Sequence, residues 1–376
     1  MPMSAVQPAS YQALLNAKVH VVNALIAPFS PPAVQVYPSQ PTGFRLRAEF
    51  RIWHDGEHID YVMFRRGEPG IPVVITEFPI ANERIQRVMP LLHTALNADR
   101  ALRHKLFQVE FLSALSGDLV ITLAYHRKLD AMWEPAAQQL ATALQSALSY
   151  APGTLSIIGR SRGKKLVIGN DYVQEVLSVQ GKEFRYRQYE QSFSQPNGGV
   201  NIQMIEWACE QATSLQGDLL ELYCGNGNFT LPLARLFDNV IATELAKSSI
   251  RAARANLVEN GMDNVQLLRL SAEEVTQAMN AERAFRRLRE LPKPLDEYAL
   301  NTLLVDPPRT GLDQHTLAMA ARFQTIIYIS CNPHTLADNL QSLDATHRIS
   351  QFALFDQFPY TDHMECGVLL QSRETA

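Results

Sequence analysis

Short apolar runs separated by helical stretches make up the chain from residue 218 onward. Each run is rich in β-branched and leucine side chains, which is typical of strands buried on both faces of a sheet. We expect such strands at 218–223, 239–243, 265–269, 302–305, 325–329 and 349–355, and a last one at 366–370. Strands that alternate with helices predict an α/β fold with a doubly wound, mostly parallel sheet, whose ligands bind beyond the carboxyl ends of the strands.

The first half of the chain follows a different pattern, in which alternating segments are mixed with helical ones. Residues 44–53 alternate apolar with charged side chains and lead into the turn at Asp55 and Gly56, which predicts a half-buried strand and a hairpin. Further strands are expected at 61–64, 109–112, 120–125 and 165–168, and helices at 82–97 and 131–149. We therefore expect an N-terminal α+β domain over residues 1–185 and the doubly wound domain over residues 186–376.

Composition restricts the class of protein. The 376 residues and the hydrophobic fraction of 46% suit two globular domains. No apolar run approaches the ~20 residues of a membrane-spanning helix, and we expect no secretory signal, hence a cytoplasmic protein without a membrane partner. The cysteines are Cys209, Cys224, Cys331 and Cys366. Because their spacing shows no pairs, we expect no metal and no iron–sulfur cluster.

Charge is unevenly distributed along the chain. Residues 1–190 hold 20 basic against 16 acidic side chains, whereas the remainder holds 14 against 22. The first half contains three basic clusters: Arg45, Arg47 and Arg51; Arg100, Arg103 and Lys105; and Arg160, Arg162, Lys164 and Lys165. Aromatic residues lie among them, namely Phe44, Phe50, Trp53, Phe107 and Phe111. Such residues suit RNA, because cations neutralise phosphates and aromatic rings stack unpaired bases. A solvated charged face over an aromatic core explains the pattern equally well, and the sequence leaves both open.

A glycine-containing loop follows the first of the expected buried strands. Gly225 and Gly227 permit a tight turn close to a ligand, and Glu244 ends the next strand ~20 residues later, where an acid can bind both hydroxyls of a ribose. The loop lacks the G-x-G-x-x-G fingerprint of nicotinamide-binding proteins. It therefore favours S-adenosylmethionine, which carries an adenosine without a pyrophosphate.

The segment Ser330-Cys331-Asn332-Pro333 directly follows the strand expected at 325–329. Asn332 and Pro333 are typical of an N-cap and a first helical position, so Cys331 should lie between the carboxyl end of a strand and the N-terminus of a helix. A helix dipole stabilises a thiolate, so we expect a lowered pKa and a nucleophilic role for Cys331. The alternative is a small buried core residue.

Two further segments place acidic side chains at strand ends. The prolines of Asp306-Pro307-Pro308-Arg309 hold the chain extended and project Asp306 and Arg309 into the expected crevice. Arg309 stands where some enzymes that methylate exocyclic amines have an aromatic residue, so it suits a phosphate or a base edge instead. Glu365, just before the last strand, is a candidate proton acceptor. The alternatives are a strand terminator for the proline segment and a surface carboxylate for Glu365.

Together these residues match methylation at carbon 5 of a pyrimidine. That carbon becomes nucleophilic only after a thiolate has added to carbon 6, and a base must then remove the proton on carbon 5 so that the thiolate can leave. Cys331 and Glu365 fit these two roles.

The sequence resembles the RNA uracil-C5 methyltransferase family over essentially its whole length, and within it the enzymes that act on tRNA. The segments that carry the resemblance are FRIWHDG at 50–56, LRHKLFQ at 102–108, SFSQPN at 192–197, LELYCGNGNF at 220–229, VDPPR at 305–309, SCNP at 330–333 and HMECG at 363–367. The resemblance implies Cys331 as nucleophile and Glu365 as base. It also implies binding of S-adenosylmethionine by Gln195, Tyr223, Asn228, Glu244 and Asp306, and RNA contacts by Phe107 and Arg309.

The resemblance further implies a fold, a reaction and partners. It implies a class I S-adenosylmethionine-dependent methyltransferase fold and methylation of the T-loop uridine at position 54 of tRNA to ribothymidine, with tmRNA as a further substrate that mimics a T-loop. We expect a monomer, although the sequence does not determine the oligomeric state. Relatives that modify ribosomal RNA carry an N-terminal cysteine cluster that is absent before Cys209, which favours tRNA. Gly198, Gly199 and Val200 depart from the family pattern, and we expect them to loosen the loop that holds Gln195.

Two rival interpretations stay open at this point. The same chemistry can act on ribosomal RNA or DNA, and an RNA-binding or RNA-folding factor can carry a vestigial methyltransferase half. Intact Cys331, Glu365 and Glu244 argue against the second.

Overall fold

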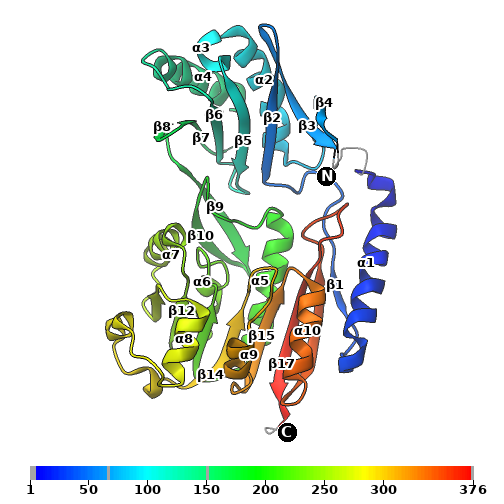
Figure 1. Cartoon of the computed structure of the whole chain (residues 1–376), viewed down its shortest axis with the longest axis vertical. Coiled ribbons are helices and arrows are strands. Elements are labelled where there is room, and N and C mark those ends of the chain that lie inside the picture. Colours follow the sequence, from blue (N-terminus) through cyan, green and yellow to red (C-terminus); the bar gives the residue numbers. More distant parts are fainter. Residues whose placement is uncertain (1–5, 66–67, 150–151, 374–376) are drawn as a thin grey trace.

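The computed structural model describes residues 6–65, 68–149 and 152–373, which form three β-sheets arranged along the long axis of the molecule (Figure 1). The N-terminal sheet has seven strands in the order β4-β3-β2-β5-β6-β7-β8. The C-terminal sheet has eight, in the order β1-β16-β17-β15-β14-β11-β12-β13. A two-stranded ribbon, β9 (Tyr172–Val179) and β10 (Lys182–Tyr189), lies between them.

The N-terminal sheet follows from the alternation of apolar and polar residues. Its strands are β2 (Arg47–Asp55), β3 (His58–Arg65), β4 (Glu68–Val74), β5 (Leu106–Ser113), β6 (Leu119–Tyr125), β7 (Leu155–Ser161) and β8 (Lys164–Ile168). In β2, Phe50 and Ile52 are buried while Arg51 and Trp53 point outward, as expected of a strand with one solvated face. Helices α2 (Glu83–Ala98) and α4 (Trp133–Ala147) bury their apolar residues in the same core as Phe50.

The aromatic residues of the first half divide between core and surface. Phe44, Phe50 and Phe111 are at most 8% exposed and belong to the core, whereas Trp53 is 45% exposed. Phe107 is half-buried at the surface. The structure therefore excludes the first three residues from base stacking and leaves Trp53 and Phe107 available.

The C-terminal sheet confirms the predicted doubly wound α/β fold. Its strands are β1 (Gln35–Tyr37), β11 (Asp218–Leu222), β12 (Val240–Thr243), β13 (Val265–Leu268), β14 (Leu300–Val305), β15 (Thr325–Ser330), β16 (His347–Phe355) and β17 (Glu365–Ser372). All neighbouring pairs are parallel except those that β17 makes with β15 and β16. The accompanying helices are α5 (Gly198–Ala212), α6 (Thr230–Leu233), α7 (Lys247–Glu259), α8 (Ala272–Met279), α9 (Gln314–Ala320) and α10 (Pro333–Leu343). No described helix is both long and apolar enough to cross a membrane.

The N-terminal segment lies with the C-terminal sheet, although the chain then enters the other sheet. Strand β1 pairs in parallel with β16, and helix α1 (Tyr11–Ile26) packs beside α10, at the right of the view in Figure 1. Val22 and Ile26 of α1 are fully buried in the core under this sheet. We retain two domains divided near residue 185 as a proposal, in which residues 11–37 are added to the C-terminal domain.

A buried ion pair joins helix α1 to the C-terminal segment. Lys18 Nζ lies 2.7 Å from Asp356 Oδ1 and also donates hydrogen bonds to the carbonyl oxygens of Phe358 (2.9 Å) and His363 (3.0 Å). Both charged side chains are at most 9% exposed. The ammonium group therefore uses all three donors within the protein, and it holds the loop that leads into β17.

Replacing Lys18 by Met should lower the free energy of unfolding by about 3 kcal/mol, because Asp356 would stay buried without its counter-charge. Urea denaturation followed by circular dichroism measures this change. The matched control is Gln12→Met on the exposed face of the same helix, for which we expect a change below about 0.5 kcal/mol. Equal stability of the two variants would contradict the proposed importance of the ion pair.

Candidate active site

A pocket of ≈ 530 Å³ lies at the carboxyl ends of the central strands of the C-terminal sheet. The predicted site residues that line it are Gln195, Tyr223, Asn228, Glu244, Asp306, Arg309, Cys331 and Glu365. Phe107 lies elsewhere, at the start of β5 in the N-terminal sheet. The fold thus brings together every predicted site residue but one, from loops that follow β11, β12, β14 and β15 and from two segments outside them.

The loop after β11 turns sharply at its first residue. Tyr223 has a φ of 60°, and Gly225 and Gly227 have φ values of 57° and 89°. Glycine adopts this left-handed region easily, whereas a tyrosine does so at a cost of about 1–2 kcal/mol. Such strain at a pocket is a signal of function, because the surrounding structure must hold the residue in place.

Hydrogen bonds orient Glu244, which follows β12, and Asn228, which lies in the loop after β11. Glu244 Oε2 accepts a hydrogen bond from the Gly225 N–H (3.1 Å), and its Oε1 accepts from the N–H groups of Leu245 and Ala246 (2.7 Å each). The side-chain amide of Asn228 exchanges two 2.9 Å hydrogen bonds with that of Asn201. Both side chains are therefore fixed before a ligand binds.

The loop that carries Gln195 is held by three separate parts of the chain. Arg47 of β2 donates to the carbonyl oxygens of Glu190 (2.6 Å) and Ser192 (2.5 Å). Asn197 donates to Ser39 Oγ (2.7 Å) through its side chain and to Gln357 Oε1 (3.1 Å) through its backbone. The loop therefore reaches into the pocket from a fixed base.

The glycines after Asn197 do not loosen this loop, contrary to the expectation from the sequence. Asn197 Oδ1 accepts from the Val200 N–H (3.2 Å), so Gly198 already begins helix α5. A side chain at Gly198 would place its Cβ 2.9 Å from Leu46 Cδ1 and 3.0 Å from Leu115 Cδ1. Gly198 thus permits close packing of the helix against the N-terminal sheet.

The strand register brings Glu365 beside Cys331. Ser330, the last residue of β15, lies opposite Cys366 of the antiparallel strand β17. Cys331 follows Ser330, and Glu365 precedes Cys366 on the antiparallel strand. The two residues therefore lie opposite each other, and both side chains reach the same edge of the sheet. Asn332 caps helix α10, as predicted, by accepting from the His334 N–H (3.2 Å).

The first turn of α10 also positions the proline segment. Asn332 Nδ2 and Thr335 Oγ1 donate to the carbonyl oxygen of Arg309, at 3.1 Å and 3.2 Å. The guanidinium of Arg309 reaches His363 Nδ1 at 3.2 Å. Arg309 is exposed and lines the pocket, so its charge is available to a ligand at the mouth.

The pKa of Cys331 is raised to about 11, so the predicted lowering is wrong. Burial is the largest cause, and the negative charges of Glu365 and Asp306 add to it, whereas Arg309 acts in the opposite direction. Burial also raises the pKa of Asp306 to about 7 and that of Glu365 well above its usual range. Desolvation and two neighbouring carboxyl groups therefore outweigh the helix dipole.

Phe107 belongs to a stacked surface in the N-terminal sheet. Its ring lies parallel to that of His126, with centroids 4.0 Å apart, and the guanidinium of Arg51 lies 5.7 Å from its centroid. His126 was not predicted from the sequence. Phe107 lies at an irregularity in the antiparallel pairing of β5 with β6, between the pairs Leu106–Tyr125 and Gln108–Ala124, so no regular strand pattern in the sequence indicates that its ring meets His126.

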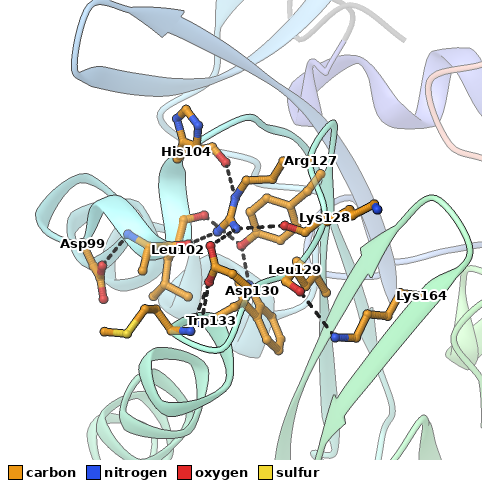
Figure 2. Close-up of polar contacts among 12 residues, drawn as sticks. Asp99, Leu102, His104, Arg127, Lys128, Leu129, Asp130, Trp133 and Lys164 are labelled. Carbon is orange, nitrogen blue, oxygen red and sulfur yellow. Dashed lines mark hydrogen bonds and ion pairs between the residues drawn. The ribbon is translucent and has the colours of Figure 1, made fainter.

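Hydrogen bonds of Arg127 join the chain segments that flank Phe107 and His126 (Figure 2). The guanidinium of Arg127 donates to the carbonyl oxygens of His104 (2.9 Å) and Lys128 (3.1 Å) and to Asp130 Oδ2 (2.8 Å). It also donates to the carbonyl oxygen of Ala101 in α3 (Arg100–Arg103). Arg127 therefore joins the segment before Phe107 to the segment after His126.

Alkylation of Cys331 by iodoacetamide should keep accelerating about tenfold per pH unit up to about pH 10, because only the thiolate reacts and its pKa is raised. Cys209, Cys224 and Cys366 are buried, so brief labelling and mass spectrometry of the Cys331 peptide measure this rate. Arg309→Gln should slow alkylation at pH 9, since it removes a charge that favours the thiolate. A rate that levels off below pH 9 would disprove the raised pKa.

Comparison with known proteins identifies the family. Residues 10–373 match the model of the family described as tRNA (Uracil-5-)-methyltransferase. A tRNA/tmRNA (uracil-C(5))-methyltransferase of Aromatoleum aromaticum is 51% identical over 373 residues, which are 99% of this chain and 98% of that protein. A protein of the same name from Pseudomonas aeruginosa strain LESB58 is 53% identical over 368 residues, which are 97% and 98% of the two chains.

A solved structure shares the fold. The tRNA (uracil-54, C5)-methyltransferase of Pyrococcus abyssi, solved in complex with S-adenosyl-L-homocysteine, superposes with a TM-score of 0.71. It is 21% identical in sequence and covers 96% of this chain and 83% of its own. The match to the family along nearly the whole length, together with the identity of these relatives, shows that the chain belongs to the tRNA (uracil-5-)-methyltransferase family.

Proposed function

We propose that this protein methylates carbon 5 of the T-loop uridine at position 54 of tRNA, with S-adenosylmethionine as methyl donor, and yields ribothymidine. The observation that carries the proposal is the pocket shared by the Cys331 thiol, the buried Glu365 carboxyl and the loop with Glu244. The names of the relatives support uracil as the target base and add tmRNA as a substrate. Because all these residues come from one chain, we propose a monomer.

The residues of the pocket fit S-adenosylmethionine. Gln195 Oε1 is buried without a hydrogen-bond partner among the described residues, which costs about 1–3 kcal/mol unless a ligand pairs with it. Glu244 retains lone pairs beside its three backbone hydrogen bonds, so it can accept from ribose hydroxyls. We assign Tyr223, Asn228 and Asp306 to the remaining contacts. When bound, the donor supplies a methyl group on a positively charged sulfur.

Cys331 acts as the nucleophile in this proposal. Its thiolate forms a bond to carbon 6 of the uracil, and the electrons of the carbon 5–carbon 6 double bond move into the ring carbonyl to give an enolate. Carbon 5 of this enolate then takes the methyl group from the sulfonium; the electrons of the broken carbon–sulfur bond stay on sulfur, and the donor leaves as S-adenosylhomocysteine. A thiol with a raised pKa gives a more nucleophilic thiolate once it is ionised, which suits this addition.

Glu365 acts as the base that completes the reaction. Its carboxylate takes the proton from carbon 5, the carbon 5–carbon 6 double bond forms again, and the bond to Cys331 breaks with release of the thiolate. Glu365 Oε2 is buried and has no hydrogen-bond partner among the described residues. The raised pKa of Glu365 gives its carboxylate a greater affinity for the proton than an exposed glutamate has.

The RNA would contact both halves of the protein. We propose that Phe107 and His126 stack on bases of the T-arm and that Arg51 and Arg309 bind phosphates or base edges. The stacked surface lies on the N-terminal sheet, and Arg309 lies at the pocket in the C-terminal sheet. This division suits a uridine that leaves its stack while the rest of the arm stays bound.

A tRNA with 5-fluorouridine at position 54 alone should form a denaturation-resistant adduct with this protein in the presence of S-adenosylmethionine. Fluorine cannot leave as a cation, so elimination stops after methyl transfer and the bond to Cys331 remains. Gel electrophoresis and peptide mass spectrometry detect the adduct. Cys331→Ala should bind the tRNA but form no adduct, and a tRNA fluorinated only outside the T-loop should not react. Absence of the adduct in the wild type, or its presence in the variant, would refute the covalent route.

Glu365→Gln should allow methyl transfer but slow elimination by about 100-fold or more, because the amide cannot accept the proton. A covalent complex with unmodified tRNA should then accumulate and be visible on a denaturing gel. The control is Glu57→Gln, whose side chain is 87% exposed. Normal turnover of the Glu365 variant would assign the base to another group.

A further inference from the structure

Side chains that commonly bind metals gather at a second place, in the N-terminal sheet. His58 and Asp60 lie two residues apart on β3 and so point to the same side, and His93 comes from α2. Asp60 Oδ1 lies 3.4 Å from His58 Nε2 and 3.0 Å from His93 Nε2. The three atoms all lie within 4.8 Å of one another.

We propose that His58, Asp60 and His93 form a zinc-binding site. Tetrahedral zinc holds nitrogen and oxygen ligands at about 2.0–2.2 Å, which places neighbouring ligand atoms about 3.3 Å apart. The two distances to Asp60 Oδ1 match this spacing. Two imidazoles and one carboxylate favour zinc over magnesium or calcium, which prefer oxygen ligands, and a water molecule would complete the tetrahedron.

The backbone between two of the ligands is held in place against the helix that carries the third. Asn97, one turn after His93, accepts from the Ile59 N–H (2.9 Å) and donates to the Ile59 carbonyl oxygen (3.1 Å). The same amide donates to the His93 carbonyl oxygen (3.1 Å), and its Nδ2 also lies 3.3 Å from His93 Nε2, a contact that zinc would replace at that nitrogen. Ile59 itself is 1% exposed, so the strand cannot move independently of α2. Little reorganisation is therefore needed to bring the three ligands together.

The surroundings leave the site open to an ion. The side chains of Asp60 and His93 are each 30% exposed, while that of His58 is 57% exposed and leaves a path from solvent. Arg103 follows the end of α2 by a few residues. It pairs with Glu57 (3.3 Å) and donates to the Asn97 carbonyl oxygen (3.0 Å). Its charge is thus directed to other acceptors than Asp60.

The site is separate from the proposed active site. None of its residues lines the pocket with Cys331. A zinc ion here would join β3 to α2 and so stabilise the N-terminal sheet, because it binds the folded but not the unfolded arrangement of the ligands. This inference does not depend on the proposed function.

Titration of Zn²⁺ alone into untagged, chelator-treated protein, followed by calorimetry, tests the site. The Cys331→Ala background removes the half-exposed thiol as a competing ligand. We expect one zinc ion per chain and at least tenfold weaker binding after His58→Gln with His93→Gln, or after Asp60→Asn. His20→Gln, on the exposed face of α1, is the matched control and should bind zinc like its parent.

Thermal unfolding gives an independent measurement. Zinc should raise the melting temperature of the parent and of the His20 variant, but not that of the His58/His93 double variant. Circular dichroism without zinc shows whether each variant is folded. We expect them to fold, because Asp60→Asn and the double variant replace each side chain by one of similar size and polarity. Failure of the parent to bind zinc, or equal affinity in the parent and the double variant, would overturn the proposal.

Discussion

Strand β17 runs antiparallel between β15 and β16, and its register decides where the two proposed catalytic groups meet. Glu365 lies opposite Phe355 on one side, and Cys366 lies opposite Ser330 on the other. A slip of one residue would turn the side chain of Glu365 to the other face of the sheet. Gly367 helps to prevent such a slip, because a Cβ there would lie 2.8 Å from Trp207 of α5. Close packing under one glycine thus determines the position of the carboxyl group in the pocket.

The loops around the pocket depend on helix α1, on the segment after β1 and on the N-terminal sheet. Lys18 holds the loop that leads into β17, Ser39 binds the base of the Gln195 loop, and Arg47 binds that loop from the N-terminal sheet. A catalytic domain cut at residue 186 would lose all three contacts. The two halves therefore both hold the pocket loops in place, and a change in the N-terminal sheet can reach the Gln195 loop through Arg47.

The sequence predicted the fold where burial alone determines structure. Strands β11, β12 and β15 are buried at every residue, so their apolar runs identify them without knowledge of neighbours. Strand β1 was not predicted, because it is three residues long and largely exposed at the edge of the C-terminal sheet. Only its pairing with β16 defines it as a strand. The glycine loop, Glu244 and the cap at Asn332 were predicted from local chemistry. Cys331 and Glu365 were paired by the reaction that they fit, but their contact in space depends on the direction of β17, which the sequence does not show; Gln195 was assigned through the family resemblance alone.

The wrong prediction for Cys331 has a consequence for the proposed reaction. A helix N-terminus is a local feature, whereas burial and the charges of Glu365 and Asp306 come from the assembled pocket and dominate the pKa of the thiol. Three ionised acids in one buried pocket would repel one another, so each of them raises the cost of ionising the other two. A positive charge placed in the same pocket lowers the cost of forming a thiolate. If the donor is a sulfonium, Cys331 would therefore ionise more readily while the donor is bound in the pocket. A thiolate would be scarce while no donor is bound.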